Sequence, residues 1–251
     1  MSTSAAIEKR VRAKLASDAL IGVDGVTGIC VYGSVARGQA NEDSDIDVLV
    51  VGTDPKLRPS VLHKLLPEKL RDGTVTISYY TWAELSEYLK RSPRFGAHLQ
   101  REGWIVHDLD GKLARVLGEE RPIDTSREVT RQLRLLRTLS HTDRFGGRFL
   151  FPLAQVYRIG RTVTYAQLAS RGVLEFDQQT AFRRLAAAVP EWTSEISTIA
   201  RLAPFYARTR SRSTKERFPF DPNGNDAAAE FRQAYNAVLT IADEKPQGRV
   251  S

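Results

Sequence analysis

The sequence predicts a mixed α/β domain, of the α+β type, followed by an all-α domain. Over the first 120 residues, short runs of β-branched and aromatic residues alternate with stretches of helical periodicity. From residue 121 onward, helical stretches follow one another and strand signals are scarce. The 251 residues are enough for two domains of ordinary size. We therefore expect a mixed sheet with helices over 1–120 and a helical bundle over 121–251, divided in the segment ERPIDTSRE.

The first domain begins with a predicted helix over about residues 5–20. Ile7, Val11, Leu15 and Leu20 recur at helical spacing, so we expect them to form its buried face. Apolar runs rich in β-branched residues predict the strands, at 26–32, 46–51, 74–81 and in WIVHD near residue 104. Periodic stretches between the strands predict helices, at 57–70 with a bend near Pro67 and at 82–90.

The second domain is predicted from periodic segments that are separated by Gly, Pro and Asp residues. The expected helices are RQLRLLRTLSH, PLAQVYRIGRTVTYAQLAS, QQTAFRRLAAAV and AAAEFRQAYNAVLTIAD. Thr125 or Ser126 is expected to cap the first of these helices, because their hydroxyls can accept from free N–H groups.

Charge is distributed unevenly along the chain. The net charge is +7, with 16 Lys and Arg against 17 Asp and Glu through Glu120, and 21 against 13 from Arg121 onward. The basic residues of the second half are nearly all arginines, whose planar guanidinium pairs well with phosphate. The most basic stretch is YARTRSRSTKERF, at 206–218. An anionic partner such as RNA or a nucleotide fits this pattern, and an arginine-rich surface with a solvated basic loop fits it equally.

Composition disfavours membrane, secreted and disulfide-bonded classes. The sequence has no apolar run of about 18 residues that could span a membrane. The N-terminal MSTSAAIEKRVRAKL lacks the apolar segment of a secretory signal. Cys30 is the single cysteine, so an internal disulfide and a cysteine-based metal cage are excluded. We expect a cytoplasmic protein.

Two aspartates in the stretch GSVARGQANEDSDIDVLV point to a metal site. Residues two apart on a strand face the same side, so Asp45 and Asp47 are expected side by side, with Ile46 turned into the core. Neighbouring carboxylates repel each other unless a cation lies between them. Their hard oxygen atoms suit Mg²⁺ or Mn²⁺ rather than Zn²⁺.

The start of the same stretch points to phosphate. Gly33 and Ser34 lie between a predicted strand and a helix expected to begin near Val35. Backbone N–H groups and a serine hydroxyl at such a turn can hold phosphate oxygens. On its own, a Gly-Ser pair usually forms a simple turn, and an Asp-x-Asp pair usually lies on the surface. Together at this spacing, the two pairs indicate a metal–triphosphate site.

GSVARG followed by SDIDVLV resembles the signature of the polymerase-β-like nucleotidyltransferase superfamily, and most of all its minimal nucleotidyltransferases, with GSxARG and SDIDLxV. The resemblance implies a mixed sheet flanked by helices, binding of a nucleoside triphosphate with Mg²⁺ (or Mn²⁺), and transfer of a nucleoside monophosphate to an acceptor. It implies that Asp45 and Asp47 are catalytic and bind the metal, and that Gly33 and Ser34 hold the triphosphate. Arg37 would lie near phosphate or pair with a nearby acid.

One feature of the family pattern is missing from the sequence. Active members usually carry a third carboxylate on a later strand, and the matching positions here are Thr76 and Ser78. The third carboxylate could come from elsewhere, the acceptor could supply the base, or the domain could bind nucleotide without efficient transfer. The candidates for a carboxylate from elsewhere are Asp72, Glu84, Glu102 and Asp108.

These features leave several functions open. We expect a nucleotidyltransferase, with RNA, such as tRNA, or a protein favoured as acceptor. The alternatives are a nucleotide-binding regulatory or antitoxin-like protein with a degenerate site, and an enzyme acting on a small molecule of the aminoglycoside type. The helical domain would bind the acceptor or form a bundle like that of HEPN ribonucleases. Arg134 and His141 resemble the Arg-x6-His pattern of those enzymes, and we expect both residues to lie on one helix face.

Overall fold

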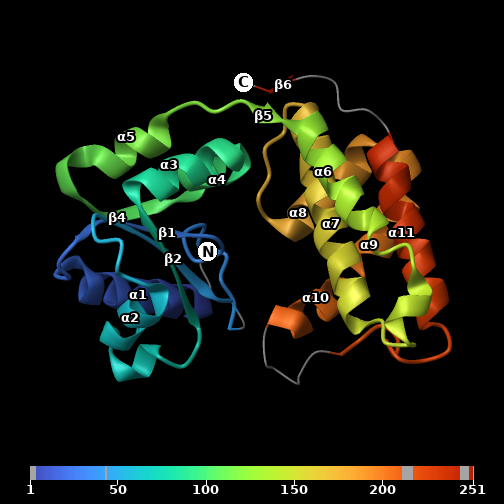
Figure 1. Cartoon of the computed structure of the whole chain (residues 1–251), viewed down its shortest axis with the longest axis horizontal. Coiled ribbons are helices and arrows are strands. Elements are labelled where there is room, and N and C mark those ends of the chain that lie inside the picture. The colour runs from blue at the N-terminus through green and yellow to red at the C-terminus, as the bar shows by residue number, and fades with distance from the viewer. Residues whose placement is uncertain (1–3, 43, 211–216, 244–248, 251) are drawn as a thin grey trace. The chain divides into compact units, whose positions relative to one another are not determined.

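The computed structural model describes residues 4–42, 44–210, 217–243 and 249–250. The chain divides into two compact units, Met1–Pro122 and Ile123–Val250, coloured blue to green and green to red in Figure 1. The basic residues at 211–216, part of the stretch singled out above, lie outside the described residues. No helix of the described part is long and apolar enough to cross a membrane.

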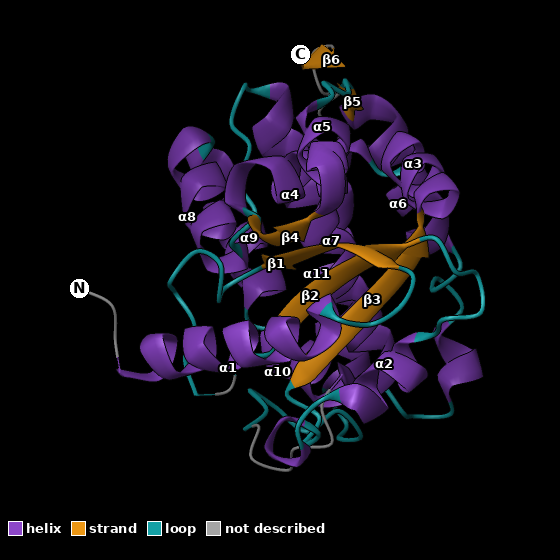
Figure 2. Cartoon of the chain, turned by 90° about the vertical axis from the view of Figure 1, so that its left-hand side faces the viewer, coloured by secondary structure: helices purple, strands orange, loops and turns teal. Residues whose placement is uncertain are grey.

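The first unit is built on a mixed sheet, which confirms the expected fold class. Its strands are β1 (Val26–Tyr32), β2 (Ile46–Gly52), β3 (Val75–Thr81) and β4 (Trp104–Asp108). They lie in the order β3-β2-β1-β4 (Figure 2). β1 runs antiparallel to both β2 and β4, whereas β2 and β3 are parallel. Each of the four predicted runs therefore forms a strand.

Helices cover both faces of this sheet. The helices α1 (Ser4–Ile21) and α2 (Pro59–Leu65) pack on one face, where β2 contributes Ile46, Val48 and Val50. The other face is covered by α3 (Trp82–Arg91), α4 (Pro93–Glu102) and α5 (Lys112–Gly118), against Leu49 and Val51. Because side chains alternate along a strand, Asp47 shares the α3–α5 face with Leu49 and Val51.

The predicted bend near Pro67 is confirmed, because α2 ends at Leu65 and a short 3₁₀ turn follows at Glu68–Leu70. Of the residues predicted to share an apolar face of α1, Leu20 is buried and Leu15 packs against the core, but the burial expected of Ile7 and Val11 is wrong. Ile7 and Val11 are 57% and 55% exposed, whereas the helix buries Ala13, Ala16 and Leu20 against the sheet. Alanines let the helix lie close to the strands, and that close approach decides which face is buried.

The second unit is helical, as predicted, and α7 (Leu150–Ser170) is its centre. α7 is buried along most of its length and packs against the surrounding helices. These are α6 (Thr125–Arg137), α8 (Gln178–Ala188), α9 (Thr193–Ala200), α10 (Ala203–Arg210) and α11 (Ala227–Asp243). Two strands of two residues each, β5 (Ile123–Asp124) and β6 (Arg249–Val250), pair as a short antiparallel ribbon.

The start of α6 differs from the prediction. Asp124, not Thr125 or Ser126, is the cap, and its carboxylate accepts from the N–H of Arg127 at 2.8 Å. Thr125 is the first helical residue instead and is fully buried.

The end of α6 separates Arg134 from His141. The helix stops at Arg137, and the hydroxyl of Ser140 bonds back to the Arg137 carbonyl at 2.8 Å. His141 lies beyond that end and precedes a 3₁₀ turn at Thr142–Phe145. The expectation that Arg134 and His141 share a helix face is therefore wrong, because the local Thr-Leu-Ser segment closes the helix one turn early.

Gly160 offers a test of packing around α7. A methyl group there would lie 2.7 Å from Cγ2 of Ile199 and 3.0 Å from Cγ2 of Val238. We expect Gly160→Ala to lower the free energy of unfolding by about 1–3 kcal/mol, despite the better helix propensity of alanine. Gly118→Ala is the control, since nothing lies within 4 Å of its added methyl. Urea denaturation measures both, and equal stability of the two variants would contradict this packing.

Candidate active site

The chain makes a compact turn over residues 33–38, directly after β1. The N–H of Arg37 donates to the carbonyl of Gly33 at 3.2 Å, and Gly38 ends the turn with φ +70. A helix from near Val35 was expected, and the structure has a single turn in its place. Only glycine adopts such a positive φ without strain, so Gly38 closes the turn before a helix can form.

This turn presents donors that the fold does not use. Among the described residues, the N–H groups of Ser34, Val35 and Ala36 donate no hydrogen bond within the chain. Consecutive N–H groups at the start of a helical turn attract anions, because their dipoles add up. The turn therefore has the donor arrangement that the sequence predicts for phosphate.

Asp47 lies at the second position of β2, in the middle of the sheet. Its register partners are Tyr32 on β1 and Thr76 on β3. Asp45 is exposed and lies just before the strand, with the fully buried Ile46 between the two aspartates. The pair is thus held at the start of β2.

Gly33 and Asp47 come into direct proximity. A Cβ atom on Gly33 would lie 2.9 Å from Oδ2 of Asp47, and Gly33 itself has φ +77. The lack of a side chain at Gly33 therefore lets the turn approach the Asp47 carboxylate closely. The turn and the Asp47 carboxylate therefore lie next to each other.

A buried lysine ties the loop before β2 to α1. Lys9 is 8% exposed and is the one buried charged side chain among the described residues. Its Nζ donates to the carbonyl of Ser44 at 2.7 Å, one residue before Asp45. Ser44 is further fixed by hydrogen bonds to Asn41. Lys9 therefore holds the backbone that carries Asp45.

Arg37 forms an ion pair with a nearby acid, which is one of the two roles expected for it. Its Nη1 lies 2.7 Å from Oε2 of Glu102, and Nε2 of His98 lies 3.1 Å from the same oxygen. Burial lowers the pKa of His98, and the Glu102 carboxylate only partly offsets this effect. Because Glu102 and His98 belong to α4, this network links the turn to the helix above the sheet.

The candidates for a third carboxylate have other roles. Asp72 pairs with Arg12 at 2.5 Å, and hydrogen bonds from Thr74 and Arg12 outweigh desolvation and lower its pKa to about 2. Glu84 and Asp108 cap helices: Glu84 in a capping box with Thr81, and Asp108 by accepting from the first N–H groups of α5. Within the described residues, no three His, Cys, Asp or Glu side chains are grouped as a metal site.

Comparison with known proteins identifies the first unit. Residues 9–98 match the family model described as a nucleotidyltransferase domain. The chain carries a nucleotidyltransferase domain. The resemblance noted in GSVARG and SDIDVLV is thereby confirmed, and both motifs lie within the matched residues.

Solved structures resemble the nucleotidyltransferase domain and its helical extension. Spectinomycin adenyltransferase AAD(9) from Enterococcus faecialis is 12% identical with a TM-score of 0.50, and the match covers 93% of this chain and 99% of that one. It shows a shared fold over nearly the whole length. A nucleotidyltransferase-like protein from Exiguobacterium sibiricum is 16% identical over 95% of this chain and 75% of that one, with a TM-score of 0.38. No curated protein sequence matches the chain.

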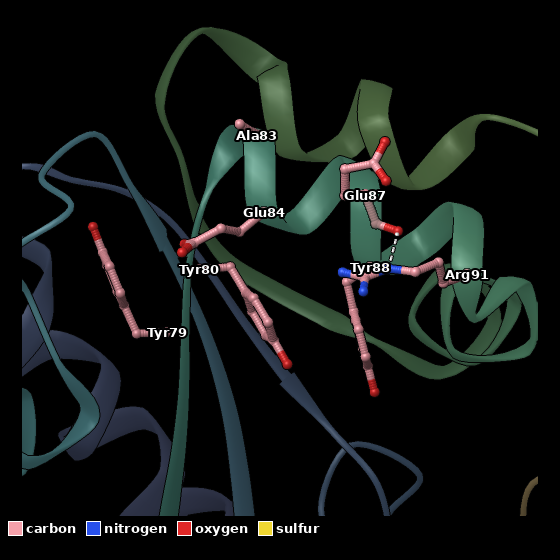
Figure 3. Close-up of a pocket in the computed structure, with 7 residues that line it drawn as sticks. All are labelled: Tyr79, Tyr80, Ala83, Glu84, Glu87, Tyr88 and Arg91. Atoms are coloured by element: carbon pink, nitrogen blue, oxygen red, sulfur yellow. Dashed lines mark hydrogen bonds between the residues drawn. The ribbon is translucent and has the colours of Figure 1, made fainter.

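Sequence reasoning missed a row of aromatic rings on the same face of the nucleotidyltransferase domain. Tyr32 meets Phe95 edge to face, Phe95 meets Tyr88 at 5.3 Å, and Tyr88 stacks on Tyr80 at 5.3 Å. Figure 3 shows the last two rings side by side with their hydroxyls pointing the same way. The helix α4, which carries Phe95, was not predicted, since its periodicity is short and interrupted by Gly96.

Tyr80 and Tyr88 line an open hollow of about 510 Å³ together with Tyr79, Glu84, Glu87 and Arg91 (Figure 3). Of the residues singled out from the sequence, the hollow contains Glu84, a candidate for the third carboxylate, but none of the predicted metal or phosphate ligands. The aromatic row connects it to Tyr32, whose pKa is raised to about 12 by burial and by the charge of Asp47. Electrostatic contact with Asp47 places the inner end of the row beside the carboxylate pair.

Two glycines of the turn provide a matched test of the Gly33–Asp47 contact. Gly33→Ala and Gly38→Ala both place alanine at a positive φ, which costs roughly 1 kcal/mol. Only the methyl on Gly33 also meets Oδ2 of Asp47, whereas nothing lies within 4 Å of one on Gly38. We expect Gly33→Ala to lower the free energy of unfolding more than Gly38→Ala, as measured by urea denaturation. The same loss in both variants would refute the contact.

Proposed function

We propose that the nucleotidyltransferase domain transfers a nucleoside monophosphate from a nucleoside triphosphate to an acceptor. The observation that carries the proposal is the meeting of Gly33 and Asp47, which places the N–H groups of the turn beside the carboxylate pair. A triphosphate held by the turn would have its phosphates next to Asp45 and Asp47. This geometry suits attack at a phosphorus atom.

The donors present fit a divalent cation. Asp45 and Asp47 offer hard carboxylate oxygens, which are the ligands that such cations prefer. When bound, Mg²⁺ or Mn²⁺ would neutralise phosphate charge and align the reacting groups. Asp45 and Asp47 would hold the ion, and the N–H groups and hydroxyl at Ser34 would orient the phosphates.

The proposed transfer is a substitution at the α-phosphorus. The acceptor oxygen forms a bond to the phosphorus, the bond to the bridging oxygen of the β-phosphate breaks, and pyrophosphate leaves. The acceptor hydroxyl loses its proton. Since no three acidic side chains of the described residues are grouped as a metal site, the proposal assigns this proton to a group on the acceptor or to solvent.

A second candidate function follows from that same absence. Without a third carboxylate, the domain could bind a triphosphate and act as a regulatory or antitoxin-like protein that transfers poorly or not at all. The missing third acid among the described residues favours this candidate. Nucleotide binding is common to both candidates, and only transfer separates them.

The acceptor is proposed from two observations. The arginine-rich second unit supports RNA or a protein partner, because guanidinium groups pair with phosphates and carboxylates. The fold shared over nearly the full length with a spectinomycin adenyltransferase supports a small hydroxylated acceptor. Both classes therefore belong in the transfer assay.

The assay uses the full chain with Mg²⁺ or Mn²⁺ and each α-labelled nucleoside triphosphate in turn. Total tRNA, cell-lysate protein and spectinomycin serve as acceptors. We expect Asp47→Asn and Asp45→Asn to lower the rate about a hundredfold or more, because the charge next to the phosphates is lost. Asp110→Asn is the control, since asparagine tolerates the positive φ of that exposed residue.

The labelled product decides the class. Label on one acceptor with the wild-type chain supports transfer and identifies that acceptor. Triphosphate binding without label on any acceptor supports the regulatory candidate instead. A wild-type rate in Asp47→Asn would refute the proposed site.

Lys9 gives an independent test of how Asp45 is held. Lys9→Met keeps the volume of the side chain but removes its hydrogen bond to the Ser44 carbonyl. We expect the affinity for Mn²⁺ with a triphosphate to fall several-fold in calorimetry, while the free energy of unfolding changes by only about 1 kcal/mol. The exposed Lys56→Met is the control. Unchanged affinity in Lys9→Met would show that the tether does not position Asp45.

A further inference from the structure

A groove along α1 adjoins the candidate site at Gly38 and contains none of the residues predicted to bind metal or nucleotide. Ile7 and Val11, one helical turn apart, line a hollow of about 510 Å³ together with Leu15 and Trp104. Their exposures of 57% and 55% are high for large apolar side chains. The N-terminal turns of α1 extend past the sheet (Figure 2). The volume is within the range of small-molecule sites, ~300–1,000 Å³.

The groove is lined by positive and apolar groups. Arg10 and Lys14 are its charged lining residues, and none of its lining residues is acidic. The guanidinium of Arg10 lies 4.9 Å from the centre of the Trp104 ring, so a cation–π contact holds it at the apolar surface. Lys14 pairs with Asp18, whereas Arg10 has no ion pair among the described residues. The groove therefore combines an apolar surface with the positive charge of Arg10. A ligand that matches it has an apolar body and a negative charge.

We infer that this groove binds a small anionic amphiphile, with an aliphatic or aromatic body and one carboxylate or phosphate group. The body lies against Ile7, Val11 and Trp104, and the anionic group pairs with Arg10. A second copy of the chain fits less well, because two α1 faces packed together bring Arg10 and Lys14 near their own counterparts. Gly38, the last residue of the turn, also lines the groove, yet the inference does not depend on nucleotide transfer.

The first experiment compares two probes of equal chain length and opposite charge. Dodecanoate and dodecyltrimethylammonium are titrated into the full chain by calorimetry, below their micelle concentrations. We expect dodecanoate to bind with a 1:1 stoichiometry and at least about tenfold more tightly than the cation. Equal affinity for the two probes, or no binding of dodecanoate, would overturn the inference.

Variants then locate the binding. Ile7→Ser/Val11→Ser removes the apolar lining, and we expect it to weaken dodecanoate about tenfold or more. Arg10→Gln should reduce the preference for the anion. The matched control is Val61→Ser/Leu65→Ser on α2, which changes a similarly spaced pair that is 44% and 47% exposed.

Two further outcomes would count against the groove. An equal loss of binding in the α2 control would show that dodecanoate contacts exposed apolar surface in general. Light scattering of the wild-type chain tests for a second copy as occupant. If the wild-type chain forms a dimer that Ile7→Ser/Val11→Ser dissociates, the groove is an interface between two copies and the inference of an amphiphile is wrong.

Discussion

The approach of Gly33 to the carboxylate of Asp47 is the constraint around which the first unit is arranged. Gly33 has φ +77, and a Cβ atom there would lie 2.9 Å from Oδ2 of Asp47, so glycine lets the turn meet the strand with the least strain. The antiparallel register of β1 and β2, which pairs Tyr32 with Asp47, brings the two together. The sheet thus sets the distance between Gly33 and Asp47, and the turn contributes its N–H donors.

Interactions from both faces of the sheet hold this arrangement in place. From one face, Lys9 on α1 fixes the backbone before Asp45. From the other, Glu102 on α4 holds Arg37, and Tyr32 packs against the helix through Phe95 and His98. A buried lysine is expensive to desolvate, so its place beside the loop is explained by the loop it fixes rather than by packing alone.

The strands and the paired motifs were predictable because their signals are local. β-branched runs mark β1 and β2, and the spacing of Asp45 and Asp47 follows from strand geometry. The buried face of α1 was not predictable, because Ala13 and Ala16 are weaker apolar signals than Ile7 and Val11 and only the nearness of the sheet selects them. The pairing of Arg37 with Glu102 spans 65 positions and leaves no local pattern.

The register partners of Asp47 on the two neighbouring strands, Tyr32 and Thr76, both carry hydroxyl groups. With its pKa raised to about 12 by burial and by Asp47, Tyr32 stays protonated near neutral pH. Thr76, the register partner of Asp47 on β3, carries a hydroxyl that does not ionise there. Protonated hydroxyl groups at these positions can donate hydrogen bonds to phosphate oxygens. The hydroxyls on the neighbouring strands therefore complement the phosphate groups that the proposed function assigns to this part of the sheet.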